Sequence, residues 1–149
     1  MELEKEIFSK SFESYYNKAI INVVYTYGWI NNHLKTELDK FNLTHQQFNI
    51  LRILRGQHPN PATINLLKER MLDKMSDASR IVDRLVQKEF VNRCVNKKDR
   101  RAADITITKK GLAILEQIHL DVSMREVLKN NLTEEEAHQL SDLLDKLRG

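Results

Sequence analysis

Cysteine, glycine and proline are scarce in this chain: its 149 residues include one cysteine, four glycines and two prolines. The single cysteine, Cys94, excludes an internal disulfide framework and agrees with a reducing compartment. No apolar run approaches the roughly 20 residues that a membrane span requires. The acidic first residues lack the basic and then apolar order of a secretion signal. We therefore expect a cytoplasmic protein without a membrane partner.

Patterns typical of enzymes and metal sites are missing as well. The sequence has no glycine-rich phosphate loop, no nucleophile elbow and no paired-carboxylate setting. No two of its five histidines are spaced three to five residues apart, as two ligands on one helical face would be. Most lone cysteines are buried and pack as small hydrophobic side chains. We favour this role for Cys94 over that of a redox sensor. We expect neither an enzyme nor a bound metal or cofactor.

Positive charge is concentrated in the middle of the chain. Residues 68–110 contain thirteen Lys and Arg against seven Asp and Glu, a local net charge of +6, whereas the whole chain carries +3. The remainder is therefore negative. This asymmetry suits one surface to a polyanion such as nucleic acid, although a solvated charged face would show it too.

Long amphipathic segments flank this basic region. Apolar residues in steps of three and four predict a helix over about residues 11–40, roughly 45 Å long. They are Phe12, Tyr15, Ala19, Val23, Tyr27, Ile30, Leu34 and Leu38. A second helix is predicted to begin after Thr108 and to run through residue 131, and a third follows the capping box of Thr133 and Glu136. Their apolar faces exceed what a small domain can cover, so we expect a homodimer.

Three shorter helices are predicted between them. Thr44 and Gln47 form a capping box, and Gly56 is expected just past the end of that helix. A short helix over 62–71 then leads through a brief turn into the segment KMSDASRIVDRLVQKE, with Asp73 as the expected cap and Ser76 as the alternative.

The segment KMSDASRIVDRLVQKE has an apolar and a polar face. The residues expected to be buried are Met75, Ala78, Val82, Leu85 and Val86. The opposite side carries Ser76, Asp77, Arg80, Asp83, Arg84 and Gln87. Two short helices joined by a tight turn, the second with a polar and cationic outer face, are typical of a helix-turn-helix.

A basic hairpin follows directly. FVNRCV and ADITIT are strand candidates, and the loop between them carries Lys97, Lys98, Arg100 and Arg101. Strand, cationic loop and strand behind a helix-turn-helix predict a winged helix. Such a wing places Lys and Arg against phosphates and can insert one side chain into the minor groove.

These residues resemble the MarR family (multiple antibiotic resistance regulators). The resemblance runs over about residues 41–111, through SRIVDRLVQKEFVNR, DRR and ITITKKG, with flanking helices in the expected order. It implies a mainly α (α+β) winged helix-turn-helix with a two-stranded wing. The expected parts are an N-terminal dimerisation helix (1–40), the DNA-binding domain (41–110) and C-terminal dimerisation helices (111–149).

The resemblance further implies a homodimeric, sequence-specific transcription regulator, usually a repressor, that binds a pseudo-palindromic site in double-stranded DNA. Carried over by position, Ser76, Asp77 and Arg80 approach base edges, Arg84 a phosphate, and Arg101 the minor groove. The full expected DNA-binding set is Thr63, Ser76, Asp77, Ser79, Arg80, Arg84, Lys97, Lys98, Asp99, Arg100 and Arg101.

Two of these assignments have alternatives that the residues leave open. Asp99 is expected to hold Arg101, because a charge-assisted bond orders that side chain before it binds, or it is simply a turn residue at the loop tip. Thr63 corresponds to a phosphate-contacting position, or it is a plain helix cap. Glu89 stands where the family often has glycine, so the helix before it either ends differently or tolerates a left-handed residue.

Small-molecule control is also implied by the resemblance, with an aromatic or anionic effector lying between the dimer helices and the DNA-binding domain. Tyr15, Tyr16, Trp29 and His33 could line such a cleft, although an aromatic stripe at helical spacing is also typical of a core. The alternative function is a winged-helix module for architectural DNA binding or protein contacts. Hydrogen-bonding side chains such as Ser76 and Arg80 favour base-specific reading over it.

Overall fold

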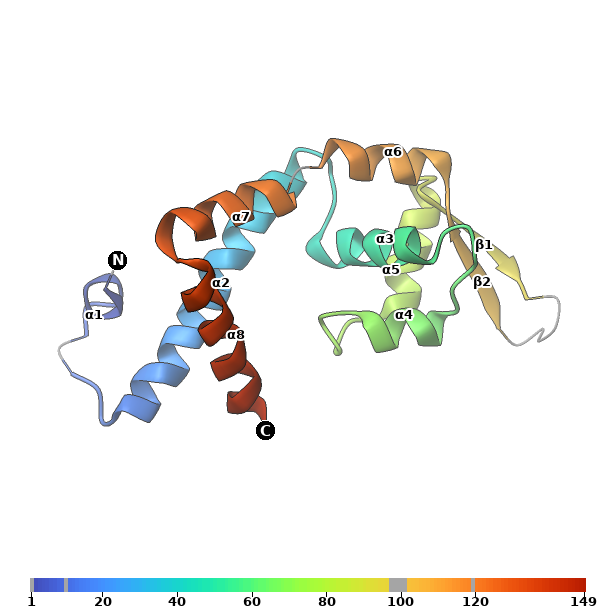
Figure 1. Ribbon diagram of the computed structural model, residues 1–149. Helices are drawn as coiled ribbons and strands as arrows, with labels where there is room; N and C mark the ends of the chain where they lie inside the picture. Colours follow the sequence, from blue (N-terminus) through green and yellow to red (C-terminus); the bar gives the residue numbers. More distant parts are fainter. Residues whose placement is uncertain (1, 10, 97–101, 119) are drawn as a thin grey trace.

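The computed structural model describes residues 2–9, 11–96, 102–118 and 120–149, without the side chains of residues 120–123, and has two lobes (Figure 1). The lobe that we call the helical lobe contains α1 (Leu3–Glu6), α2 (Tyr15–Asp39), α7 (Leu120–Asn131) and α8 (Glu134–Arg148). The other, the reader lobe, contains α3 (His45–Gln57), α4 (Ile64–Arg70), α5 (Ala78–Gln87), β1 (Val91–Val95), β2 (Ala103–Ile107) and α6 (Lys109–Gln117). The predicted fold class, a winged helix between flanking helices, is confirmed.

The reader lobe is built around α3, which contacts α2, α4, α5, α6 and β2. Helix α3 begins with the predicted capping box: the Thr44 hydroxyl accepts from the Gln47 N–H, and the Gln47 side chain accepts from the Thr44 N–H. The side chains that fill the core are almost fully buried, and they come from every element of the lobe. They include Ile50, Leu51, Leu54, Leu67, Val82, Leu85, Val91, Ile105 and Leu115.

The turn before α5 differs from the prediction. Asp77, not Asp73 or Ser76, caps α5, and its carboxylate lies 3.2 Å from the Arg80 backbone nitrogen. Asp73 instead accepts from the Met75 N–H (3.0 Å) and the Ser76 hydroxyl (2.6 Å), which closes a local turn. Because Met75 lies in this turn, it is 93% exposed and not part of the buried stripe.

Other helix boundaries also differ. Gly56 lies inside α3, which continues through Gln57 and ends where Pro59 forbids further helix. Phe12 precedes α2, which is capped by Ser14. The long C-terminal helix is interrupted at Ile118, whose backbone is extended and whose side chain is 8% exposed in the core of the reader lobe. This break gives α6 to the reader lobe, so the reader lobe extends beyond the predicted boundary at residue 110.

The wing is an antiparallel pair in which Val91 faces Ile107 and Val95 faces Ala103. Ala62, just before α4, exchanges backbone hydrogen bonds of 2.9 and 2.8 Å with Ile105 and so ties the wing to the helix-turn-helix. Thr108 caps α6 as predicted, its hydroxyl accepting from the Gly111 N–H.

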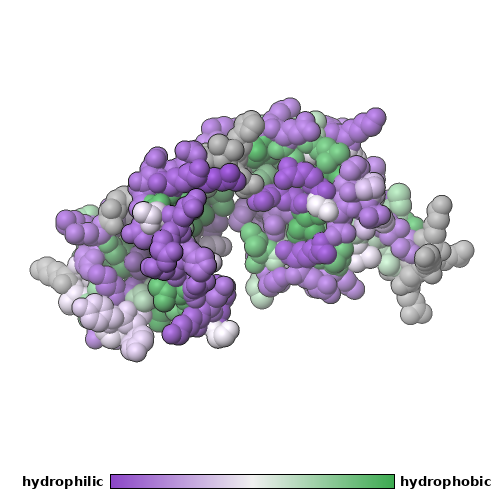
Figure 2. Space-filling model, in the orientation of Figure 1, coloured by the Kyte–Doolittle hydropathy of each residue, from purple (hydrophilic) through white to green (hydrophobic). Residues whose placement is uncertain are grey.

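The helical lobe leaves much of its apolar surface open. Glu4 pairs with Lys18, and the Tyr25 hydroxyl donates to Glu6 at 2.9 Å, which fixes α1 on α2 and raises the pKa of Tyr25. The exposed large apolar side chains of α2 and α8 include Tyr15, Tyr16, Ile20, Val24, Tyr27, Leu140, Leu143 and Leu147. Figure 2 shows hydrophobic residues at the surface of this lobe. Much of the apolar face predicted for α2 and α8 is therefore open in the single chain, whereas Leu38 near the end of α2 is fully buried. None of the described helices is long and apolar enough to cross a membrane.

Two glycines provide a matched test of the packing. A Cβ at Gly111 would lie 2.8 Å from Ile107 Cγ1 and closer still to the Phe90 carbonyl oxygen, whereas a Cβ at Gly56 meets nothing within 4 Å. We expect Gly111→Ala to lower the free energy of unfolding by about 1–3 kcal/mol and Gly56→Ala to raise it by up to about 1 kcal/mol. Urea unfolding measures both, and equal effects at the two positions would contradict this packing.

Candidate nucleic-acid interface

The outer face of α5 is cationic because its inner face is used for packing. Ala78, Val82 and Leu85 are at most 1% exposed, so the 3.6-residue period turns Arg80 and Arg84 to the opposite side, where both are exposed. Of the other predicted contacts, Ser76 and Ser79 are partly buried beside them. The helix thus presents hydrogen-bonding and cationic groups on one open surface.

The two acidic residues of this surface are held locally. Asp77 caps the first turn of α5. Asp83 lies 2.5 Å from Arg93 of β1, which joins α5 to the wing. An acid on this face could also have held Arg80 or Arg84, but the ion pair of Asp83 is with Arg93. The role of Arg93 could not be predicted from the sequence, because a spacing of ten residues does not show that a helix and a strand bring Asp83 and Arg93 together.

Thr63 is a helix cap in the structure. Its hydroxyl accepts from the Leu66 N–H at 3.2 Å and begins α4. The side chain is only partly buried, so the cap leaves its outer surface open. A phosphate contact by Thr63 stays a prediction beside this observed role.

The wing is described up to the base of its loop. The Asn96 N–H donates to the Ala102 carbonyl oxygen at 3.0 Å, and the Asn96 amide donates to Asp104 at 2.7 Å. The predicted cations and their partner lie outside the described residues: Lys97, Lys98, Asp99, Arg100 and Arg101. The pairing of Asp99 with Arg101 therefore stays a prediction, while the hairpin beneath it is in place.

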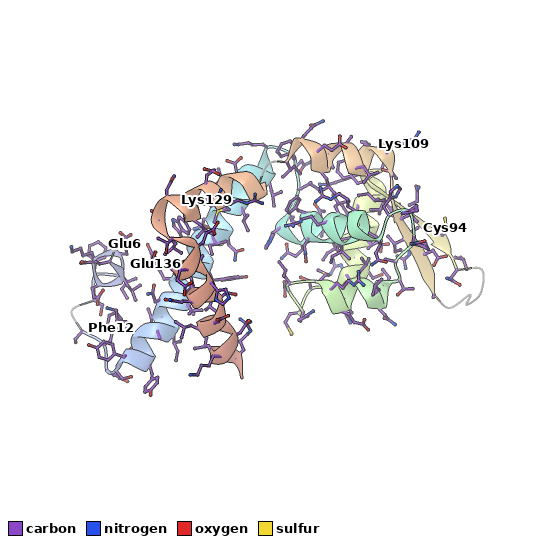
Figure 3. The ribbon with its side chains drawn as sticks, viewed as in Figure 1. Glu6, Phe12, Cys94, Lys109, Lys129 and Glu136 are labelled. Atoms are coloured by element: carbon purple, nitrogen blue, oxygen red, sulfur yellow. The ribbon has the colours of Figure 1, made fainter. Side chains whose placement is uncertain are left out.

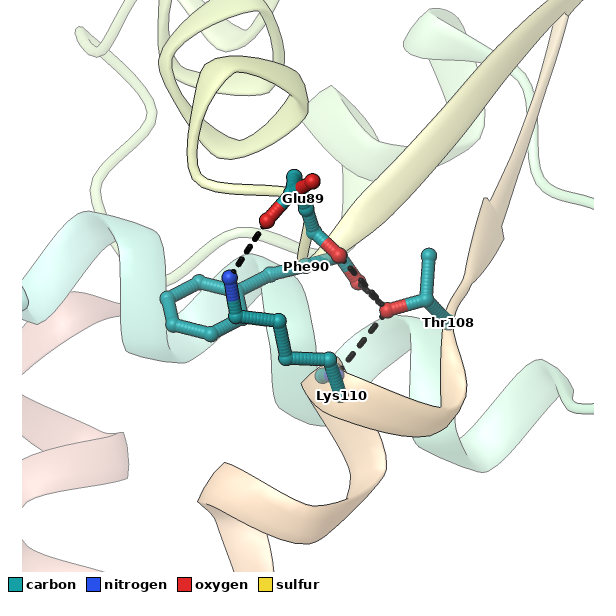
Figure 4. Close-up of polar contacts among 5 residues, drawn as sticks. Glu89, Phe90, Thr108 and Lys110 are labelled. Carbon is teal, nitrogen blue, oxygen red and sulfur yellow. Dashed lines mark hydrogen bonds and ion pairs between the residues drawn. The ribbon is translucent and has the colours of Figure 1, made fainter.

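The end of α5, the start of the wing and the start of α6 meet near Glu89 (Figure 4). Glu89 adopts a left-handed backbone with φ of +61°, so the position tolerates a side chain where glycine is the ordinary choice. The Thr108 hydroxyl donates to the carbonyl oxygens of Glu89 and Phe90, at 2.8 and 3.1 Å. The Lys110 ammonium lies 2.7 Å from the Glu89 carboxylate and lowers the pKa of that group.

A cleft of about 580 Å³ separates α2 from the reader lobe. Its walls come from α2, the start of α3 and the turn before α5, and they include Tyr27, Lys35, His45, Leu72 and Lys74. Partial burial lowers the pKa of His45, and Asp73 opposes this shift. The cleft combines apolar groups with charges of both signs, because Asp39 and Asp73 line it beside the two lysines.

The four residues predicted to line an effector pocket are not brought together there. Tyr15 and Tyr16 are 89% and 86% exposed and border a separate hollow near the N-terminus. Trp29 lines a smaller cavity of about 180 Å³ with Leu3 and Tyr25. His33 is partly buried on α2 and is not among the residues that line the 580 Å³ cleft. The aromatic stripe therefore follows the helix, not one cavity.

Neither Cys94 nor the histidines among the described residues are grouped as metal ligands would be. Cys94 is exposed on β1 (Figure 3), so the expectation of a packed side chain is wrong. Within the described part of the chain, no three His, Cys, Asp or Glu residues are grouped to hold a metal ion.

This chain is similar to known proteins in sequence and in fold. The MarR family model matches residues 43–103. The multiple antibiotic resistance protein MarR of Escherichia coli (strain K12) is 33% identical over 116 residues, which cover 76% of this chain and 79% of that protein. The HTH-type transcriptional regulator MhqR of Bacillus subtilis (strain 168) is 27% identical over 131 residues, or 87% and 89%. The crystal structure of an E. coli MarR mutant complexed with operator DNA covers 99% of both chains, with 28% identity and a TM-score of 0.74.

Proposed function

The chain belongs to the MarR family of DNA-binding transcription regulators, and on this premise we propose that it is a homodimeric repressor of a pseudo-palindromic operator, relieved by a small effector. Proteins of this family are transcription regulators, not enzymes. The observation that carries the proposal is the outer face of α5, where Arg80 and Arg84 are exposed. The inner face packs through Ala78, Val82 and Leu85, which are buried, while Val86 of the predicted stripe is 37% exposed. A rigid helix with an open polar face is what base reading in the major groove requires.

The contacts are divided by chemistry. Ser76, Ser79 and Arg80 lie toward the start of α5, the end that reaches base edges in helix-turn-helix proteins, and Arg84 one turn later is suited to a phosphate. Asp77 acts mainly by capping the helix, which supports the proposed contacts of its neighbours. In the wing, Lys97, Lys98 and Arg100 attract phosphates, and Arg101, held by Asp99, enters the minor groove.

The open apolar faces of α2 and α8 support a homodimer. Tyr27 is 66% exposed and Leu143 is 64% exposed, and both belong to larger apolar stripes. Contiguous apolar surface of this kind marks an interface more often than a solvated face. A second copy would cover these faces and place two α5 helices for two half-sites. We assign dimerisation to residues 1–40 and to α7 and α8, with α6 retained in the reader lobe.

The 580 Å³ cleft is the proposed effector site. Tyr27 and Leu72 offer apolar contact, so an aromatic compound fits the lining. Its polar groups would meet charges of both signs, from Lys35 and Lys74 and from Asp39 and Asp73. The cleft lies between α2 and the turn before α5. An occupant would therefore change how α5 lies relative to the dimerisation helices, which relieves repression. Of the residues first expected at the effector site, Tyr15, Tyr16, Trp29 and His33 are not part of this proposal.

Two arginine substitutions separate base-specific recognition from general attraction to phosphates. We expect Arg80→Ala to reduce discrimination between cognate and random DNA by about 1–3 kcal/mol. Arg101→Ala should weaken binding to both kinds of DNA and reduce the slope of affinity against salt by about 1. Titrations of the promoter region beside the gene, at several salt concentrations, measure both. An unchanged affinity for Arg101→Ala would refute the wing assignment, and unchanged discrimination for Arg80→Ala would favour the architectural alternative.

The dimer is tested by one added charge. Leu143→Asp should weaken self-association by on the order of a hundredfold or more, because burying an unpaired carboxylate costs several kcal/mol. Ser141→Asp adds the same charge on another side of α8 and should leave the dimer intact. Sedimentation at micromolar concentration distinguishes the two states. A wild-type chain that sediments as a monomer there would contradict the proposal.

A further inference from the structure

Asp83 lies on α5 at a position where two different arginines are able to hold its carboxylate. Arg80 precedes Asp83 by three residues on the same helix, and side chains at this spacing are neighbours on a helix surface. Arg93 approaches Asp83 from β1, a strand that contacts α5. The carboxylate therefore has one candidate partner within the recognition helix and one in the wing.

Of these two pairings, the structure contains the one with the wing. An Asp83 carboxylate oxygen lies 2.5 Å from a guanidinium nitrogen of Arg93. Arg80 is exposed, and its backbone N–H donates to Asp77. Within the part of the chain that the structure describes, the Arg80 guanidinium forms no hydrogen bond or ion pair. The side chain proposed to read bases is thus left without a competing acid.

The ion pair between Asp83 and Arg93 is too exposed to matter much for folding. The side chains are 53% and 35% exposed, and pairs in such positions add little to stability. The wing is also held to the reader lobe by the backbone hydrogen bonds between Ala62 and Ile105, at 2.9 and 2.8 Å. Loss of the pair should therefore leave the fold in place, and its effect should appear in binding.

Arg80 is the residue that loss of the pair would affect. Without Arg93, the Asp83 carboxylate would have Arg80 as its cationic neighbour on the helix surface, since the adjacent Arg84 points in a different direction. An arginine reads guanine by donating from its planar fork to two acceptors on the base edge. An Arg80 held by Asp83 would first have to break that contact, which lowers its preference for the correct base.

We propose that Arg93 is a positioning residue: it holds Asp83 on the wing side of α5 and so keeps Arg80 free to read bases. The inference rests on the proposed function, in which Arg80 meets base edges. Arg93 needs no contact with DNA for this role. The wing strand thus contributes to sequence discrimination as well as to attraction of phosphates.

The test measures the ratio of affinities for cognate and random DNA, because this ratio cancels general attraction to phosphates. Full-length protein is titrated with a duplex that carries the sequence selected by the wild-type chain, and with a scrambled duplex of equal length. The variants are Arg93→Met, Asp83→Asn and the two together. Arg93→Met is also combined with Arg80→Ala. Lys68→Met is the matched control, because it removes one exposed cation from α4 of the same lobe.

We expect Arg93→Met to lower the affinity ratio about two- to fivefold, the change that corresponds to one exposed ion pair. Adding Asp83→Asn should restore the ratio, because a neutral amide holds Arg80 only weakly. Combined with Arg80→Ala, Arg93→Met should have no further effect on the ratio, since no Arg80 remains to be held. Lys68→Met should lower both affinities alike. Melting temperatures should change little throughout.

Two results would overturn the positioning role and leave the regulator in place. One is a full wild-type ratio in Arg93→Met. The other is a lowered ratio that Asp83→Asn does not restore, or that falls as far when Arg80 is absent, which would mean that Arg93 acts on DNA by another route. If the wild-type chain does not distinguish the two duplexes, or Arg80→Ala distinguishes them equally well, the proposed base reading fails, and this inference with it.

Discussion

Packing of the apolar stripe of α5 against α3 is the interaction on which the interface depends. Val82 and Leu85 of α5 and Leu51 of α3 belong to one core, in which all three side chains are fully buried. Each such side chain contributes about 1.5–3 kcal/mol. Because the stripe occupies one face of a ten-residue helix, the cations are confined to the other. The same residues that stabilise the lobe therefore determine which side chains DNA can reach.

The connections around this packed helix extend its influence to the rest of the chain. Arg93 joins the wing to α5 through Asp83, and Ala62 joins the wing to α4. Thr108 ties the end of α5 to the start of α6 with one hydroxyl. These contacts connect the elements of the reader lobe into one unit. The open apolar faces lie on the helical lobe. This division suits a protein whose reading unit is fixed and whose spacing is set by helices outside it.

Local features could be predicted from the sequence and long-range ones could not. The capping boxes of Thr44 and Thr133 depend only on residues three positions apart, and both are confirmed. The cap of α5 could not be chosen among neighbouring polar residues, because the Asn49 side chain accepts from the Leu72 N–H at 3.0 Å and helps shape the turn from outside it. The break at Ile118 could not be predicted either, because the apolar residues keep their helical period across it and the burial of Ile118 in the reader lobe is a long-range contact. The expected effector residues stay a prediction, because periodicity places Tyr15, Tyr16, Trp29 and His33 on one helix but does not show which cavity they line.

The central claim is that two copies of a packed recognition helix read two related half-sites. Selection of bound sequences from a random DNA pool tests it most directly. The account predicts enrichment of a pseudo-palindrome whose half-sites are centred about one helical turn apart, roughly 10 base pairs. Enrichment of a single asymmetric site, or of no common sequence at all, would contradict it.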